Sequence, residues 1–265
     1  MDGRLNGSSA SSRIGLHHTR RARLHYQFRE NRRDRPNGKT RVKELVLIGG
    51  GEHARVVLDA ARRGGQWTVT AYVDKVPIKS LEALGLSWLG DDTAAAQSLR
   101  DRYCIVGVGG MSEPRRRQEI VRLFDACGVK WATVVHPSAV IAATAELGVG
   151  VAVFANAVVN PGAKIGAHSI INTGAIVEHD VELGPYVHAG PGAVIGGGAA
   201  IGEGVAIGLG ARVRDHVRIG PGAMIGMGAV VVGSVRAHDT VVGVPARQLQ
   251  SRPEPGSRTP RGPAE

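Results

Sequence analysis

One repeat dominates the sequence: from Ile141 to Val231 a large aliphatic residue recurs at every sixth position. Fifteen of the sixteen positions in this series are Ile, Leu or Val, and the exception is Ala189. Two residues before each of them stands Ala, Ser or Val, without exception. A period of six fits neither an α-helix nor a single amphipathic strand. It fits a solenoid in which each hexapeptide forms one short strand and one corner.

Each position of the hexapeptide has a predicted structural role. The branched residue points inward, and the small residue two before it fits a crowded corner. Gly or Asn supplies the special backbone angle of the turn. Gly directly follows this sixth-position residue at 148, 166, 184, 190, 196, 202, 208, 220 and 226.

This pattern resembles the hexapeptide repeat of the left-handed parallel β-helix found in the hexapeptide acyltransferases, where three hexapeptides make one triangular coil. The resemblance implies that residues eighteen apart stack one coil apart, at about 4.8 Å, and that the sixteen hexapeptides make roughly five coils. No insertion interrupts the period between residues 141 and 231. Catalytic groups must therefore come from the coils or from another domain.

The formal net charge of +10 belongs to the two ends of the chain. Residues 1–43 hold twelve Lys or Arg against three acidic residues, and residues 251–265 hold three Arg against two Glu. Residues 44–250 are therefore neutral overall, and the predicted folded body has no electrostatic support for binding nucleic acid.

The ends are predicted to be disordered: a basic tail over residues 1–42 and a second tail over residues 250–265. The first has no apolar segment of the kind that a secretory signal needs, although its Arg-rich composition resembles an organelle transit peptide. A plainer hypothesis is that translation starts at Val42, because Val can be encoded by an alternative bacterial start codon. Mass spectrometry of the native N-terminus tests this, and an intact Met1 peptide would contradict it.

Two cysteines, Cys104 and Cys127, are too few for a disulfide framework and are expected to be inert thiols in a reducing cytoplasm. No apolar run reaches the length of a membrane span. The sequence therefore predicts a cytoplasmic protein without a membrane partner.

Strands alternate with helices upstream of the repeat, which predicts a parallel sheet with right-handed crossovers. Strands are expected at 44–48, 68–73, 103–108 and 130–135, and helices after Gly51, at about 93–100 and at 112–127. The predicted fold class is thus α/β plus all-β. A small Rossmann-like domain occupies residues 43–136, and a left-handed parallel β-helix occupies residues 137–249.

The first strand runs into Gly49-Gly50-Gly51, and a Gly-rich turn before a helix can hold a phosphate. Asp74 ends the second strand, where such folds contact a ribose. NAD is not expected, because position 54 lacks the third Gly of the dinucleotide pattern. A sheet of three or four strands has room for a mononucleotide or a nucleotide sugar, and a tight turn without a ligand is the alternative.

The order of these parts resembles the sialic acid O-acetyltransferase/sugar N-acetyltransferase family of hexapeptide-repeat acyltransferases, including the UDP-4-amino-sugar N-acetyltransferases. The resemblance covers residues 44–249 and is most specific in INTGAIVEHDVELGPYVH at 171–188, with IGGGEHARVV at 48–57 and GVPA at 243–246. It implies a bacterial enzyme that acetylates a sugar or nucleotide-linked amino sugar from acetyl-CoA. It also implies a homotrimer with acetyl-CoA in the groove between neighbouring helices, and no metal.

The resemblance further implies the roles of individual residues. His179 is the general base, with Asp180 as its carboxylate partner. The other residues implied at the acyl-transfer site are His188 and Gly197, which contact acetyl-CoA, and Asn172 and Glu178, which line the same site. The nucleotide-sugar pocket is formed by Gly49, Gly50, Gly51, His53 and Asp74. The chain departs from the family at Glu52 and Ala54, where relatives commonly carry a small residue and Gly. The negative charge of Glu52 is unfavourable beside a diphosphate. The identity of the nucleotide-linked sugar therefore stays open.

The residues support this assignment independently in one place. His179 and Gly197 are eighteen apart, so stacking puts a proton acceptor and a backbone donor on the same wall of the β-helix. Acyl transfer needs both: a base for the attacking group and a donor for the developing oxyanion. A neighbouring carboxylate fixes the tautomer and orientation of the histidine. His168 and His216 are expected to face solvent.

Other β-helix functions fit the residues less well. A zinc hydratase of the γ-carbonic anhydrase type needs a close pair of histidines, but the histidines of this repeat are 11, 9 and 28 residues apart. A non-catalytic sugar-binding scaffold stays open and would bind acetyl-CoA without turnover. O-acetylation also stays open, because the same base serves an amine or a hydroxyl. The prediction is N-acetylation of a nucleotide-linked 4-amino-deoxysugar in bacterial surface glycan synthesis.

Overall fold

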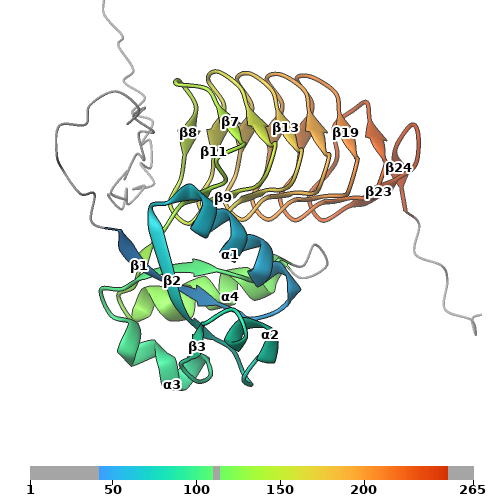
Figure 1. Ribbon diagram of the computed structural model, residues 1–265. Helices are drawn as coiled ribbons and strands as arrows, with labels where there is room; N and C mark the ends of the chain where they lie inside the picture. Colours follow the sequence, from blue (N-terminus) through green and yellow to red (C-terminus); the bar gives the residue numbers. More distant parts are fainter. Residues whose placement is uncertain (1–41, 110–113, 250–265) are drawn as a thin grey trace, which may run out of the picture.

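The computed structural model describes residues 42–109 and 114–249, which form an α/β unit followed by a three-sided β-helix (Figure 1). The α/β unit is a parallel five-stranded sheet in the order β3-β2-β1-β4-β5. Its strands are β1 Lys43–Ile48, β2 Trp67–Val73, β3 Ser87–Trp88, β4 Tyr103–Val106 and β5 Lys130–Trp131. The predicted parallel sheet with alternating helices is confirmed, but it has five strands and not the expected three or four, because the short β3 was not predicted.

Helices cover both faces of this sheet. They are α1 Glu52–Gly64, α2 Lys79–Glu82, α3 Asp92–Ala96 with the 3₁₀ helix η1 Gln97–Leu99 directly after it, and α4 Pro114–Ala126. The amphipathic α1 buries Ala54, Val57 and Leu58. It ends at Gly65, whose left-handed backbone (φ 68°) lets its N–H reach the carbonyl of Arg62. α3 begins at Asp91, whose carboxylate accepts hydrogen bonds from two backbone amides of the first turn.

The β-helix has three faces, each a stack of short strands that are parallel and two residues long, except at the end of the third face, where β23 has three residues and β24 pairs with it antiparallel. The first face holds β7 Val140–Ile141, β10 Val158–Val159, β13 Ile176–Val177, β16 Val194–Ile195, β19 Arg212–Val213 and β22 Val230–Val231. The second holds β8 Glu146–Leu147, β11 Lys164–Ile165, β14 Glu182–Leu183, β17 Ala200–Ile201 and β20 Arg218–Ile219. The third holds β6 Val134–Val135, β9 Ala152–Val153, β12 Ile170–Ile171, β15 His188–Ala189, β18 Ala206–Ile207, β21 Met224–Ile225, β23 Thr240–Val242 and β24 Arg247–Gln248.

The predicted register of eighteen residues is confirmed on every face. Val158 pairs with Ile176, for example, and Lys164 pairs with Glu182. The offset falls to sixteen only at the end, where Met224 pairs with Thr240. From β6 to β23 the second residue of each strand points inward, and these side chains, aliphatic throughout, form one continuous core along the axis.

Two kinds of glycine make the corners possible. The left-handed turn position comes three residues after the inward aliphatic residue and is filled by residues such as Gly150 (φ 70°) and Asn156 (φ 58°). This confirms that Gly or Asn supplies the turn angle. The Gly directly after the aliphatic residue has another purpose. A Cβ on Gly166 would lie 2.3 Å from the carbonyl carbon of Gly184, so successive coils could not approach each other.

The prediction of a single strand at 130–135 is wrong, because this segment forms two separate strands. β5 extends the α/β sheet, whereas β6 pairs with β9 and opens the third face of the β-helix. The short apolar run could not show this division, because the two halves differ only in their partners. The first strand of the β-helix therefore precedes His136.

The α/β unit packs on the third face. Ala152, Phe154 and Ile170 share one buried apolar cluster with α1 and the sheet, and Figure 1 shows α1 between the sheet and the β-helix. Within residues 42–109 and 114–249, no helix combines the length and the apolar character that a membrane crossing needs.

Candidate active site

The first group of predicted site residues lies at the corner between the first and second faces. Nδ1 of His179 is 3.0 Å from Oδ2 of Asp180, and both side chains are mostly exposed. Asp180 has a left-handed backbone (φ 57°), and its side chain folds over Gly162 of the preceding coil. The carboxylate holds the proton of the imidazole on Nδ1, so Nε2 is left as the acceptor.

Gly197 occupies the same corner one coil further on, as the repeat predicts. A Cβ on residue 197 would lie 2.6 Å from Nε2 of His179, so only Gly leaves room for the imidazole. The amides of Gly196 and Gly198 donate to Val213 and His179. The amide of Gly197 donates to no group in the described part of the chain. A proton acceptor and an unused backbone donor therefore lie side by side.

Glu178 precedes this pair in the chain but has a partner of its own. Its Oε2 accepts a hydrogen bond from Nδ2 of Asn160, one coil back, at 3.1 Å. The carboxylate is therefore held along the wall of the β-helix next to the His179 corner.

A second group forms where the α/β unit meets the third face. His188, on β15, is buried, and its Nε2 is 3.1 Å from Nδ2 of Asn172. His53, in the first turn of α1, has its ring centroid 6.2 Å from that of His188 and packs edge-on against Phe154 at 5.3 Å. Nε2 of His53 is buried and has no partner among the described groups. Three predicted site residues from two units thus converge here.

Burial keeps both of these histidines neutral. Burial lowers the pKa of His53 to about 4, with the nearby Arg117 charge as the second cause. The same two causes and His53 itself lower the pKa of His188 to about 3, and a backbone interaction with Gly109 acts in the opposite direction. Neutral imidazoles can orient a ligand by hydrogen bonds without adding charge.

The Gly-rich loop lies at the N-terminus of α1, beside His53. The Gly50 amide donates to Oδ2 of Asp74 at 2.6 Å, so the acid at the end of β2 closes the loop. Gly49 has φ 100°, and a Cβ there would lie 2.6 Å from Val108. Gly51 is the N-cap of α1 and lies against open space. Amides at a helix N-terminus are suited to a phosphate.

The structure does not bring the two groups together within one chain. His179 and Gly197 lie at the corner between the first and second faces, whereas His188 lies in the third face. In a triangular coil, a face lies opposite the corner formed by the other two. The sequence analysis placed His188 and Asn172 at the acyl-transfer site with His179, whereas within one chain they lie beside His53 of the expected nucleotide-sugar pocket.

The prediction for His168 is wrong, whereas His216 is exposed as expected. The His168 ring stacks on Tyr186 (centroids 5.4 Å apart, planes 13° apart) and meets Trp131 edge-on at 4.9 Å. Burial and then the charge of Arg117 lower the pKa of His168 to about 4. The hexapeptide period cannot show this burial, because the α/β unit causes it.

The sequence analysis missed Arg117, which is only 2% exposed. Its Nη2 donates to the carbonyl of Tyr186, and its charge acts on His53, His168 and His188. Arg117 ends a run of three arginines on α4, and nothing in that run distinguishes the buried one.

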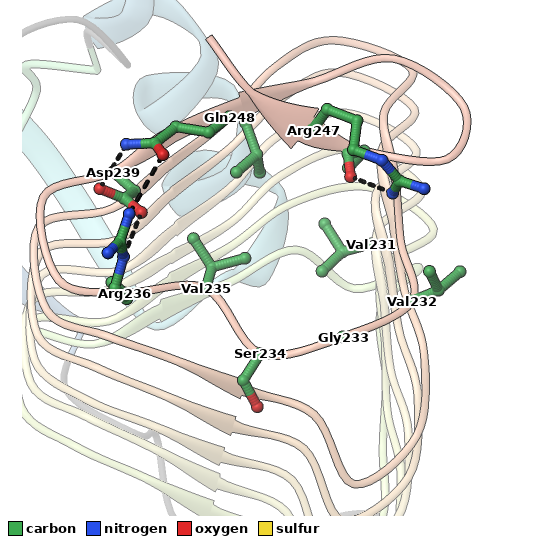
Figure 2. Close-up of a pocket in the computed structure, with 11 residues that line it drawn as sticks. Val231, Val232, Gly233, Ser234, Val235, Arg236, Asp239, Arg247 and Gln248 are labelled. Carbon is green, nitrogen blue, oxygen red and sulfur yellow. Dashed lines mark hydrogen bonds and ion pairs between the residues drawn. The ribbon is translucent and has the colours of Figure 1, made fainter. Parts of the chain in front are cut away.

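A pocket at the far end of the β-helix holds none of the predicted site residues. It is lined by Val231, Val232, Gly233, Ser234, Val235, Arg236, Asp239, Val241, Ala246, Arg247 and Gln248. Figure 2 shows Asp239 bound by both Arg236 and Gln248 at its rim. Among the described residues, no group of three or more His, Cys, Asp or Glu is arranged to hold a metal ion.

Known proteins share this architecture. Residues 44–124 match the model of the PglD N-terminal domain. Perosamine N-acetyltransferase from Caulobacter crescentus, solved with CoA and GDP-perosamine, is 37% identical over 79% of this chain and 98% of that chain, with a TM-score of 0.73. The acetyltransferase domain of PglB from Neisseria gonorrhoeae FA1090, solved with acetyl-CoA, is 33% identical over 78% and 99%, with a TM-score of 0.71.

WeeI from Acinetobacter baumannii AYE is 26% identical over 78% of this chain and 100% of that chain, with a TM-score of 0.62. The comparison with curated proteins gave no match. The fold and its relatives define an acyltransferase of the hexapeptide-repeat class. The chain belongs to the sialic acid O-acetyltransferase/sugar N-acetyltransferase family. It is an acetyltransferase that uses acetyl-CoA as co-substrate and acts on a sugar.

Proposed function

We propose that this enzyme transfers the acetyl group of acetyl-CoA to the 4-amino group of a nucleotide-linked deoxysugar used in bacterial surface glycans. The observation that carries the proposal is the pair formed by His179 and Gly197, which sets a base beside an unused amide donor. A relative of 37% identity is a perosamine N-acetyltransferase solved with CoA and GDP-perosamine. This similarity favours an amino nitrogen of the sugar as the acetyl acceptor and a sugar that is linked to a nucleotide.

The chemistry follows from this pair. Nε2 of His179 takes a proton from the amine as its nitrogen attacks the thioester carbonyl, while the Gly197 amide donates to the developing oxyanion. The tetrahedral intermediate then expels the thiolate of CoA, which takes the proton from the imidazolium. The Asp180 carboxylate stabilises the imidazolium between these steps. The products are an acetamido sugar and free CoA.

The α/β unit would hold the nucleotide part of the acceptor. The Gly-rich loop presents amides at the N-terminus of α1, where the helix dipole favours phosphate. Asp74 binds the Gly50 amide through one oxygen, and its other oxygen is the candidate contact for a ribose. Glu52 is exposed in the first turn of α1, and its charge would disfavour a phosphate placed directly beside it.

The working form is proposed to be a homotrimer with acetyl-CoA between neighbouring β-helices. In a trimer, the His179 corner of one chain can face the His53–His188 group of its neighbour, which would complete the site. The β-helix also exposes apolar side chains suited to burial: Val140 is 61% exposed, and Leu209 and Met227 lie eighteen residues apart at 53% and 79%. A stable monomer with full activity in light scattering would contradict this assembly.

Turnover assays distinguish the candidate functions. Release of free CoA, followed with a thiol reagent, is measured for UDP- and GDP-linked amino sugars, including GDP-perosamine, and for sialic acid. The proposal expects turnover with a nucleotide amino sugar and an amide product. Turnover with sialic acid alone, giving an ester, would establish O-acetylation instead. Binding of acetyl-CoA without turnover of any acceptor would establish a non-catalytic scaffold.

A further inference from the structure

The α/β unit is attached to one corner of the β-helix through three successive coils. This corner joins the second and third faces, and α4 and the strand after it lie along it. The three contacts, one coil apart, are Trp131 with the ring of His168, Arg117 with the carbonyl of Tyr186, and Gln118 with the carboxylate of Glu203 at 3.3 Å. The unit is therefore held in one orientation by contacts to backbone and side chains, besides its apolar packing.

Arg117 is the most deeply buried residue in these three contacts. Its Nη2 donates to the Tyr186 carbonyl at 2.5 Å, and Nε and Nη1 have no partner within the described part of the chain. Burial lowers the pKa of this guanidinium only to about 10, so it keeps its charge at neutral pH. Burying a charge costs free energy unless hydrogen bonds or an opposite charge compensate for it. If position 117 served only for packing, an uncharged side chain would therefore be more favourable there.

The bond connects α4 to the strand that carries His188. Tyr186 comes two residues before His188 in the same coil, and its left-handed backbone (φ 60°) directs the corner into β15. The chain enters α4 shortly after Gly109, whose backbone packs on His53: a Cβ on Gly109 would lie 2.6 Å from Cγ of that ring. Arg117 thus connects α4 to the coil that carries His188, the histidine that faces His53.

The electrostatics place the guanidinium close to the same histidines. The charge of Arg117 is the second cause, after burial, of the lowered pKa of His53 and of His188. His168, beside Tyr186, responds in the same way. The charge of Arg117 therefore acts on His53, His168 and His188 alike.

We propose that Arg117 is a positioning residue for acyl transfer, which fixes the nucleotide-sugar unit on the β-helix so that the acceptor meets the acetyl group. The inference rests on the proposed function, because it assumes that the α/β unit holds the acceptor and the β-helix holds acetyl-CoA. Loosening the bond would then separate the two substrates without weakening the site for either.

The test uses three variants of the full chain. Arg117→Met keeps an unbranched, flexible side chain but removes the charge and the donors, and Arg117→Lys keeps the charge and one donor to the Tyr186 carbonyl. Arg122→Met makes the same change at an exposed position of the same helix and is the matched control. Melting temperature, CoA affinity by calorimetry, kcat with a nucleotide amino sugar, and hydrogen exchange of 114–126 and 183–190 are measured for each.

The expected result is a split between chemistry and binding. A displacement of about 1 Å at a reacting centre can cost about 10²-fold in rate, so Arg117→Met should lose kcat on that scale while CoA affinity is unchanged. Exchange should quicken in the two segments that the bond joins and not in β1. Arg117→Lys should recover most of kcat, and Arg122→Met should match the wild type.

Two results would overturn the inference. One is wild-type kcat and wild-type exchange in Arg117→Met. The other is an equal loss of melting temperature, CoA affinity and kcat, which would show a general structural role. Failure of the proposed function is separate: the wild-type enzyme would then acetylate no nucleotide amino sugar. The exchange pattern of the variants would still show whether Arg117 holds the two units together.

NMR of isotope-labelled histidine adds a spectroscopic readout that general destabilisation would not give. Removing the nearby positive charge should raise the pKa of the His53 and His188 rings in Arg117→Met, whereas Arg117→Lys should leave both near their wild-type values. Unchanged ring titrations in Arg117→Met would contradict the placement of the guanidinium.

Discussion

The imidazole of His179 lies directly against the α-carbon of Gly197, one coil further along the β-helix. A methyl group added at residue 197 would be 2.6 Å from Nε2 and 2.8 Å from Cε1 of that ring. The atom that would collide is the mobile end of a side chain, and the Gly197 backbone has no left-handed φ. The glycine is therefore needed for the position of the histidine more than for the fold.

Gly197→Ala should consequently reduce activity with little effect on stability. The methyl group would displace the imidazole from the amide donor, so kcat should fall toward the level of a variant without the base, a loss of about 10²-fold or more. Thermal unfolding and free-CoA release are measured together. Gly233→Ala, where an added methyl meets no atom within 4 Å, is the control and should behave like the wild type. Full activity in Gly197→Ala would exclude the proposed arrangement.

His179→Ala tests the base itself. Positioned general bases contribute roughly 10² to 10⁴ in rate, so kcat should fall by that factor while the affinity for acetyl-CoA is nearly unchanged. Asp180→Asn should cost less, because it disturbs only tautomer and orientation, and Asn tolerates the left-handed backbone there. His216→Ala, an exposed histidine of the same corner two coils away, is the matched control. If His179→Ala kept more than about a third of kcat, the assignment of the base would be wrong.

The repeat made the β-helix predictable, because its period fixes which residues point inward and which stack. The pairing of Val158 with Ile176 and the contact of His179 with Gly197 follow from counting to eighteen. Asp74 and the Gly-rich loop, which the sequence analysis assigned to one pocket, are in contact through the Gly50 amide.

The contacts between the two units could not be predicted from the period, because they depend on how one domain sits on the other. His168 is buried only because Trp131 and Tyr186 enclose it. In the sequence, Arg117 cannot be distinguished from the two arginines before it. It is buried only because the β-helix packs against this part of α4. Nor could the sequence show that His188 faces His53 while His179 lies at the opposite corner.

Acid should destabilise the protein through its buried histidines. The pKa of His168 falls from 6.5 to about 4, first through burial and then through the charge of Arg117. Between these pH values the unfolded chain binds a proton that the folded chain does not. The stabilisation is thus complete above about pH 6.5 and is lost as the pH falls toward 4.

His168→Asn removes this titration, and Asn suits the left-handed backbone (φ 57°). Its free energy of unfolding should depend less steeply on pH between 4 and 6.5, by at most about 1.4 kcal/mol per pH unit. Unfolding midpoints from pH 4.5 to 7.5, at one protein concentration, give this slope. His216→Asn, also left-handed (φ 55°) but exposed, is the control. Equal slopes for His168→Asn and the wild type would show that His168 is not held neutral.

Turnover should not require a metal, because the imidazole of His179 and the amide of Gly197 supply both the base and the oxyanion donor. Dialysis against EDTA should leave kcat unchanged, and added zinc should not raise it. Loss of turnover on dialysis with recovery on addition of zinc would overturn the mechanism.

His188 should act on acetyl-CoA binding rather than on the chemical step. The amide nitrogen of Asn172 donates to Nε2 of His188 at 3.1 Å, so the proton of the neutral ring is on Nδ1. Burial and the charges of Arg117 and His53 lower the pKa of this ring to about 3, so it stays neutral at every pH at which the enzyme is assayed. His188 is therefore poised to hold a neutral group such as a thioester or amide, and not to move a proton.

His188→Ala should raise the KM for acetyl-CoA by a larger factor than it lowers kcat. Asn172→Ala should change the same parameter in the same direction but less, because it removes only the group that orients the ring. The KM for acetyl-CoA of the wild-type enzyme should show no step attributable to His188 between pH 5 and 9, since that ring does not titrate in this range. Initial rates over a matrix of acetyl-CoA concentrations and pH give both results. A fall in kcat with an unchanged KM in His188→Ala would place this histidine in the chemical step instead.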